Sequence, residues 1–336
     1  MGTHTAGKQG GGKDQYLQFL RGVALGAVVL IHVLATCFEY ADLIVVRPFL
    51  NFSVALFVIL SGYLTPAAKC ADLRGFYSRR VGKILWPYLL WSFFYLAVSH
   101  RLQPLTVCKA LLIGGSSAQL YYLVVYLQLV LLTPLLHRWL ARGGAPRIAL
   151  WCVTPLCLVV RYALTFAGLP SANIRAFCGT WLAYYLFGLE WKNRFAPWLQ
   201  RHGVGIRRLA LLVAAGICLQ WLEGVAWHMW GNDELAITHM RFSALFTSLV
   251  VAAWLMSFSE RGRSRLAACR PLVVLGDLSF GVYLCHMAAI KLWSHFLPAA
   301  GLWSVPMFLA VLVASAVGVA VCKRLLPRRV CGWLGF

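Results

Sequence analysis

The chain contains ten apolar stretches, each long enough to cross a lipid bilayer as a helix, and this feature restricts it to a membrane fold. A hydrocarbon core about 30 Å thick requires about 17–25 predominantly apolar residues per helix. Only 12% of the residues are charged and 61% are hydrophobic, whereas soluble domains carry about 25% charged residues. The sequence therefore predicts an all-α, polytopic membrane protein with about ten transmembrane helices, over residues 16–36, 49–66, 84–99, 119–137, 148–168, 176–191, 207–223, 240–258, 272–296 and 303–322.

The basic residues predict how these helices are oriented. The net charge is +21, and most of the 31 lysines and arginines lie in alternate segments between the apolar stretches. Because cytoplasmic segments carry an excess of Lys and Arg, this alternation predicts that both termini are cytoplasmic. It also argues against nucleic acid as a partner, since the charge orients the protein and contacts anionic membrane lipids. We expect a disordered cytoplasmic tail at 1–14, one ten-helix domain at 15–325 and a short basic cytoplasmic tail at 326–336.

Several common catalytic motifs are missing from the sequence. The eleven cysteines show no CxxC spacing and no cluster with histidine, so we expect neither a metal site nor a disulfide framework. The sequence also contains no HExxH, no GxSxG, no P-loop and no dinucleotide fingerprint. Any chemistry must therefore come from the polar residues that lie within or beside the apolar stretches.

The first apolar stretch contains two residues that are costly inside a membrane, Arg21 and His32. They are eleven positions apart, which places them within about 20° of one helix face and about 16 Å apart along the axis. Such residues usually face a bundle interior and mark a functional site. In the alternative interpretation, Arg21 snorkels to the lipid headgroups and His32 forms a hydrogen bond with a neighbouring helix. We expect His32, near mid-depth, to act as a general base and Arg21 to bind an anion near the cytoplasmic surface. Glu39, on about the same face, is a candidate to orient His32, with helix capping as the simpler alternative.

A second cationic group, Arg79, Arg80 and Lys83, falls within one helical turn before the third stretch. It is either a positive-inside anchor or, together with Arg21, a clamp for a polyphosphate. A coenzyme A thioester suits such a site, because it has a phosphorylated head and a thin arm that ends in a reactive acyl group. We therefore expect these residues to bind an acyl-CoA donor.

The ninth stretch begins with a polar line of side chains, Asp277, Ser279, Tyr283 and His286. Their offsets place them along one helix, where they either contact a substrate or form hydrogen bonds between packed helices. The pattern leaves both interpretations open.

The external loop at 224–239 is rich in aromatic and polar residues. Its tryptophans are either interfacial anchors or stacking surfaces for a carbohydrate. Arg241 follows this loop, close in sequence to Asp233 and Glu234. We expect an ion pair between Arg241 and these carboxylates at the external mouth of the bundle.

The ordered set of motifs resembles the membrane-bound acyltransferase-3 family, which includes bacterial O-acetyltransferases of cell-surface glycans. The resemblance covers essentially the whole chain and includes the ten-helix count. It rests on Arg21 and His32, on Phe57-Val-Ile-Leu-Ser-Gly62-Tyr63, on Arg79-Arg80-Val-Gly-Lys-Ile-Leu-Trp-Pro87, on Leu123 with its aromatic neighbours, and on Ser279-Phe-Gly-Val-Tyr283-Leu-Cys-His286.

The resemblance implies an acyl-CoA donor, acetyl-CoA in the simplest case, that enters from the cytoplasm and reacts at His32 with support from Arg21. It implies an acceptor hydroxyl on a cell-surface or lipid-linked glycan, and a location in the bacterial inner membrane. Asp277 departs from the family, which usually has a small or uncharged residue there. Candidate substrate contacts are Glu39, Tyr122, Asp233, Arg241, Tyr283 and His286.

Two classes of function follow from these residues. The first is an integral-membrane O-acyltransferase, with His32 as general base or as transient acyl carrier. The second is a transporter of a small amino acid or an acyl group, which the helix count suits equally well. The chain is also similar to the membrane domain of vancomycin-resistance-type serine racemases, a module that handles an amino acid. The lack of paired, Gly/Pro-broken helices in corresponding halves argues against the transporter, and a purely structural scaffold does not explain the shared face of Arg21 and His32.

Overall fold

The computed structural model describes residues 14–298 and 300–336, and this part of the chain contains helices and no strand. The all-α prediction is therefore confirmed. The helices are α1 (Gln15–Cys37), α2 (Tyr40–Leu50), α3 (Phe52–Tyr63), α4 (Leu73–Val98), α5 (Pro104–Ile113), α6 (Tyr121–Arg142), α7 (Gly144–Phe166), α8 (Leu182–Glu190), α9 (Ala196–Arg201), α10 (Ile206–Met229), α11 (Asp233–Ile237), α12 (Phe242–Met256), α13 (Glu260–Ala267), α14 (Arg270–Asp277), α15 (Ser279–Trp293), α16 (Ser304–Leu325) and α17 (Arg328–Leu334).

Eight helical segments in the described chain are long and apolar enough to cross a bilayer. They are α1, α2 with α3, α4, α6, α7, α10, α11 with α12, and α16 with the short turn before it. α14 and α15 form a ninth if they are taken together, with a bend of 86° where α14 ends at Asp277. Length and composition thus support a polytopic membrane protein with eight or nine spans, and the count of ten stays a prediction.

The sixth predicted span, residues 176–191, is not one long helix. It consists of a 3-10 turn at Cys178–Trp181 and the nine-residue α8, whose side chains are almost all buried. α8 packs tightly against α3, and a Cβ added at Gly188 would lie 2.0 Å from the carbonyl oxygen of Ile59. This apolar run is therefore buried against protein, a situation that hydrophobicity alone does not distinguish from a span.

The two ends of the described chain are tied into the fold. The carboxylate of Asp14 accepts hydrogen bonds from the backbone amides of Tyr16 and Leu17 and so caps α1. The rest of the predicted N-terminal tail lies at residues 1–13, outside the described residues. The predicted C-terminal tail contains α17, and the indole nitrogen of Trp91 in α4 donates a 3.0 Å hydrogen bond to the carbonyl of Leu334.

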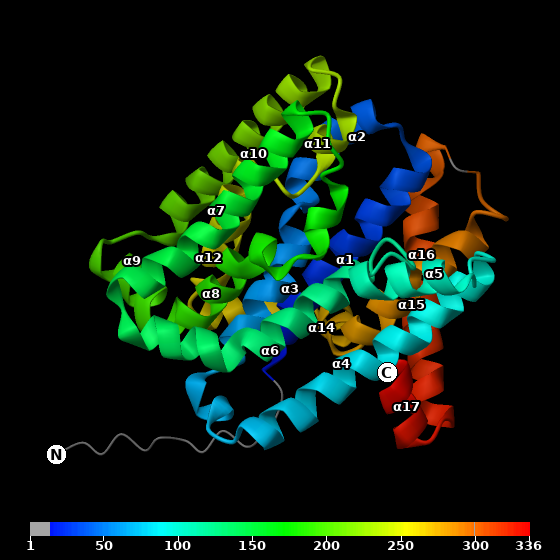
Figure 1. The fold of residues 1–336 in the computed structure, drawn as a ribbon, viewed down its shortest axis with the longest axis horizontal. Helices are drawn as coiled ribbons and strands as arrows, with labels where there is room; N and C mark the ends of the chain where they lie inside the picture. Colours follow the sequence, from blue (N-terminus) through cyan, green and yellow to red (C-terminus); the bar gives the residue numbers. More distant parts are fainter. Residues whose placement is uncertain (1–13, 299) are drawn as a thin grey trace.

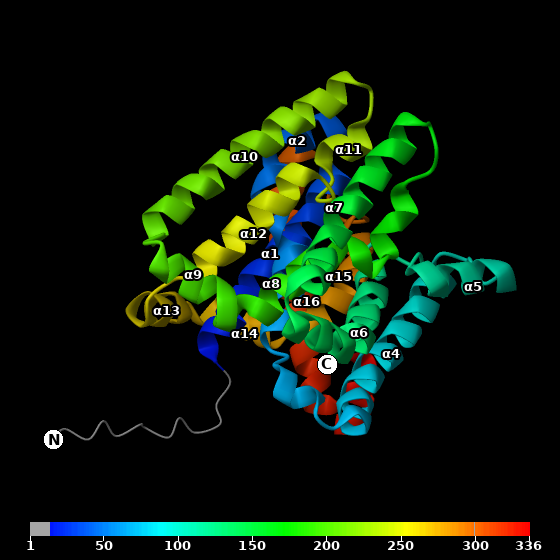
Figure 2. The same cartoon turned by 60° about the vertical axis from the view of Figure 1, so that its left-hand side comes forward.

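α1 is the central helix of the bundle and contacts α2, α3, α14, α15 and α16. In Figure 1 the N-terminal end of α1 lies low, above the start of α4, and its C-terminal end lies high. α2 and α11 gather at the top in both Figure 1 and Figure 2. We call the end that holds the start of α1 the lower end and the end that holds α2 and α11 the upper end.

Two glycines allow α14 to pack directly on α1. A Cβ at Gly22 would lie 2.0 Å from the carbonyl oxygen of Leu272, and a Cβ at Gly276 would lie 1.9 Å from that of Gln18. Small residues permit this approach because no side chain separates the two backbones. The contact fixes the start of α15 beside α1, and this places the polar line of the ninth stretch next to the Arg21 and His32 face.

Candidate active site

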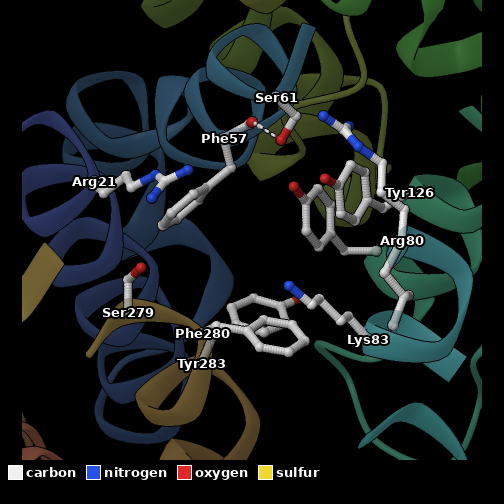
Figure 3. Close-up of a pocket in the computed structure, with 11 residues that line it drawn as sticks. Arg21, Phe57, Ser61, Arg80, Lys83, Tyr126, Ser279, Phe280 and Tyr283 are labelled. Carbon is white, nitrogen blue, oxygen red and sulfur yellow. Dashed lines mark hydrogen bonds between the residues drawn. The ribbon is translucent and has the colours of Figure 1, made fainter. Parts of the chain in front are cut away.

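A pocket of about 260 Å³ opens among α1, α3, α4, α6 and α15. Three of its lining residues are cations, Arg21, Arg80 and Lys83, and its lining contains no carboxylate within the described chain. Figure 3 shows Arg21 and Lys83 extending into the pocket from opposite sides. The predicted association of the Arg21 face with the second cationic group is thus present in the structure, and the pocket is electropositive.

Local contacts hold the cation of Arg80 at the pocket wall. Its guanidinium donates a 2.7 Å hydrogen bond to the hydroxyl of Thr65 and lies 5.0 Å from the centre of the Phe76 ring. Thr65 is fully buried, so this contact directs Arg80 toward the protein interior.

Arg79 departs from the expectation that it binds alongside Arg80. Its side chain is 67% exposed, its nearest carboxylate oxygen belongs to Asp72 at 3.9 Å, and it does not line the pocket. Adjacent residues on a helix are separated by about 100° around the axis, so Arg79 and Arg80 face different directions.

Aromatic side chains form the inner wall of the pocket. The rings of Tyr122 and Tyr283 are 5.6 Å apart, and that of Tyr283 lies 5.8 Å from His286. The hydroxyl of Tyr283 donates a short hydrogen bond to the carbonyl of Gln119, which fixes the ring. The structure therefore places both predicted tyrosines in the pocket wall, and Tyr283 also contacts His286.

His32 and His286 form a pair of imidazoles from α1 and α15, with ring centres 5.2 Å apart. His286 is fully buried, and its Nδ1 lies 2.8 Å from the carbonyl oxygen of Tyr283 and 3.2 Å from that of Val282. A carbonyl only accepts, so Nδ1 carries the proton and Nε2 of the neutral ring carries a lone pair. Nε2 has no hydrogen-bond partner in the described part of the chain. It can therefore accept a hydrogen bond from His32 or from a bound hydroxyl.

Glu39 does not share a face with His32. α1 ends at Cys37, and Glu39 is exposed just before α2, where its side chain makes no cap hydrogen bond. The helical spacing argument fails because the helix does not continue to residue 39. The expected role of Glu39 in orienting His32 has no contact to support it.

Asp233 and Glu234, the carboxylates expected to pair with Arg241, pair with other residues. Asp233 pairs with His228 at 2.5 Å, and Glu234 pairs with Arg161 of α7 at 3.3 Å. Arg241 is fully buried and donates to the carbonyl of Thr238 at 3.2 Å. Both carboxylates of the short helix α11 thus pair with other residues, so the sequence neighbours of Arg241 are not its structural partners.

The family of the chain follows from comparison with known proteins. The model of a family described as an acyltransferase domain, the acyltransferase-3 family, matches residues 14–324. The chain belongs to the acyltransferase-3 family. Neither the curated proteins nor the solved structures contain a match to this acyltransferase. The acyltransferase has multiple membrane-type helices, and its matched region includes the pocket and the histidine pair.

Sequence reasoning missed three residues near the histidine pair of this acyltransferase. Arg47 is one of them, and it is buried within α2. His239 and Tyr121 lie side by side, with 3.4 Å between Nε2 and the phenolic oxygen. The burial of Arg47 had one signal in the sequence, a cation that stands directly before a long apolar run. In the structure this cation lies inside the span that α2 and α3 form together.

Proposed function

We propose that this acyltransferase moves an acyl group, acetyl in the simplest case, from cytoplasmic acyl-CoA to a hydroxyl of a cell-surface or lipid-linked glycan. The observation that carries the proposal is the electropositive pocket whose aromatic wall leads to the paired imidazoles. The pocket offers cations to a phosphorylated group, and the imidazoles offer a base to a hydroxyl.

The donor is assigned to the pocket because of its charge and its position. Arg21, Arg80 and Lys83 provide guanidinium and ammonium donors, which suit phosphate oxygens. Arg21 and His32 are separated by about 16 Å along α1. This separation suits a molecule that carries phosphates at one end of a thin arm and a thioester at the other. In the bacterial inner membrane, with both termini in the cytoplasm, the cations of the pocket would be accessible to cytoplasmic acyl-CoA.

The reaction needs one proton acceptor and one proton donor. The imidazole of His32 takes the proton from the acceptor hydroxyl, and the hydroxyl oxygen attacks the thioester carbonyl carbon. The carbon–sulfur bond then breaks, and the leaving coenzyme A thiolate takes the proton from the imidazolium. The products are an ester and free coenzyme A, and His32 returns to its neutral form. The ring centres of His286 and His32 are 5.2 Å apart, and in this reaction the lone pair at Nε2 of His286 would accept a hydrogen bond from the imidazolium of His32.

Replacing Arg80 by glutamine is expected to raise the KM for acyl-CoA about tenfold or more, because a charge-assisted contact to phosphate is lost. Arg79→Gln is the matched control, since the neighbouring Arg79 is exposed and lies outside the pocket. The measurement is acyl-CoA binding and thioester hydrolysis by the purified protein in detergent. Equal effects of the two substitutions would contradict the donor site.

The same assay tests the proposal as a whole. Saturable acyl-CoA binding with turnover supports the acyltransferase reaction proposed here. If no acyl-CoA binds, the proposal is wrong, and flux of a labelled amino acid across proteoliposomes becomes the measurement for the transporter.

His286→Asn is expected to lower kcat about 100-fold and to leave the KM for acyl-CoA unchanged. Asparagine keeps an N–H that can bond to the carbonyl of Tyr283 but removes the lone pair of Nε2. Steady-state kinetics of acyl transfer measure both constants. A variant that loses donor binding and turnover together would show that His286 only supports the fold.

A further inference from the structure

Four arginines from separate segments of the chain lie near His239. This arginine cluster consists of Arg47 in α2, Arg161 in α7, Arg175 before the 3-10 turn at Cys178–Trp181, and Arg241 before α12. Arg47, Arg161 and Arg241 donate hydrogen bonds to Ile237 and Thr238, which directly precede His239 in the chain. Arg175 lies over the ring of Tyr121, whose hydroxyl is 3.4 Å from Nε2 of His239. Arg47, Arg161 and Arg241 are at least nine-tenths buried, with exposed fractions of 8%, 2% and 0%.

The carboxylates near the arginine cluster do not balance its charge. Glu234 pairs with Arg161 and is itself 63% exposed. Glu223 lies near Arg241, and it accepts hydrogen bonds from the hydroxyl of Tyr162 and, at 3.1 Å, from the amide of Ser243. Two carboxylates therefore serve three buried cations, and the exposed Arg175 adds a fourth positive charge. Buried charges are costly unless they are paired, so this imbalance points to an anion that is not part of the protein.

Arg47 is the member of the arginine cluster best placed to bind that anion. Its Nε donates a 3.0 Å hydrogen bond to the carbonyl of Ile237, which holds the side chain against α11. Its guanidinium makes no ion pair and no further hydrogen bond within the described residues. Two terminal nitrogens thus remain available, and their planar fork matches the oxygens of a carboxylate or phosphate.

Arg241 is less accessible to such an anion. It lines a cavity of about 10 Å³ with His239 and Trp181, and a volume of this size holds about one water molecule. Its two terminal nitrogens are buried without a hydrogen-bond partner in the described chain. We infer that Arg241 adds to the positive field and that Arg47 makes the direct contact.

Arg47 also lies close to the reacting centre. The α2 helix packs on α1, and Leu43 and Ile44, about one turn before Arg47, belong to one apolar cluster with Leu34, two residues after His32. The donor pocket approaches the histidine pair from the other side, through Tyr122 and Tyr283. An anionic group held by Arg47 would therefore accompany the acceptor hydroxyl and not the donor.

We propose that the acceptor carries a carboxylate or phosphate group, and that Arg47 binds this group while the acceptor hydroxyl faces His32. This inference rests on the proposed function for the identity of the acceptor. The anion site itself rests only on the arginine cluster.

Ligand-dependent thermal stabilisation of the full-length protein in detergent tests the site. The probes are D-glucuronate, D-glucose 6-phosphate and D-glucose, which share a sugar ring and differ in charge. Each is titrated with the donor pocket saturated by coenzyme A. We expect one or both anions to raise the Tm of the wild type, because a ligand that binds only the native state stabilises it. Glucose is expected to have no effect on the Tm. Comparison of the two anions shows whether the site binds a carboxylate, a phosphate or both.

Substitution of Arg47 provides the decisive comparison. Arg47→Gln should weaken anion binding at least about tenfold, since one partner of a buried charge pair is lost. Arg101→Gln, at an exposed arginine outside the arginine cluster, should bind as the wild type does. The site is refuted if neither anion stabilises the wild type, if glucose stabilises it equally, or if Arg47→Gln retains the effect.

Two further variants keep the test decisive. If Arg47→Gln does not fold, Arg47→Lys retains a cation without the planar fork and should bind the anion about tenfold more weakly; unchanged affinity refutes the site. Arg79→Gln should leave anion binding unchanged, because Arg79 is exposed and lies outside both the donor pocket and the arginine cluster. A failure of coenzyme A to stabilise the protein contradicts the proposed donor, whereas loss of the anion effect alone contradicts only the acceptor site.

Discussion

Replacing His32 by alanine is expected to lower kcat for acyl transfer about 100- to 10 000-fold, because a positioned general base typically contributes that much to the rate. Acyl-CoA binding should be retained, since the cations that bind the donor lie in the pocket and His32 does not line it. The measurement is transfer of a labelled acetyl group, with donor affinity determined in parallel. A loss of kcat with normal donor affinity is the signature of a group that acts in the transition state.

His295→Ala is the matched control for this prediction, because His295 is exposed beyond the end of α15. It should turn over at the wild-type rate. Full activity of His32→Ala at normal expression would rule out His32 as base and as acyl carrier. Incubation with acyl-CoA alone separates these two roles, since only a carrier gains the mass of an acyl group on the protein.

Replacing Gly22 by alanine is expected to destabilise the fold by about 3 kcal/mol or more, because overpacking against a rigid neighbour is costly. The added Cβ would lie 2.0 Å from the carbonyl oxygen of Leu272, so α14 would have to move away from α1. This movement would also displace α15 and separate His286 from His32. We expect the Tm in detergent to fall by about 5 °C or more, together with a loss of acyl transfer.

Gly26→Ala provides the control on the same helix. No atom lies within 4 Å of the Cβ that it would add, and alanine favours a helix more than glycine does. Its Tm should equal or slightly exceed that of the wild type. If Gly22→Ala and Gly26→Ala have the same Tm, the close contact between α1 and α14 does not contribute to stability.

The helical membrane fold and the histidine face were predictable because each depends on local periodicity. Apolar runs of bilayer length follow directly from residue order, and the alignment of Arg21 with His32 follows from 3.6 residues per turn. The presence of Arg21, Arg80 and Lys83 at one pocket was also predictable, because the sequence places all three near the same membrane surface. Local reasoning failed where a helix ended earlier than assumed, as at Cys37 before Glu39.

The positions of α8, Arg79 and Arg241 could not be derived from the sequence. An apolar run such as α8 has the same composition whether it faces lipid or protein. Arg79 and Arg80 are neighbours in the chain, yet only Arg80 is directed inward, by its hydrogen bond to Thr65. The partner of Arg241 depends on where α11 directs its carboxylates, and this is set by packing against α2 and α10.

Residue order alone predicts that this chain is a helical membrane protein, and that a cation and an imidazole share one face of its first helix. Both properties arise within a single helix, where spacing translates directly into geometry. The packing of the helices places His286 beside His32, and it places Arg47 near them with a guanidinium that is unpaired among the residues described. These arrangements join α1, α2 and α15, and contacts between helices depend on packing that no local pattern specifies.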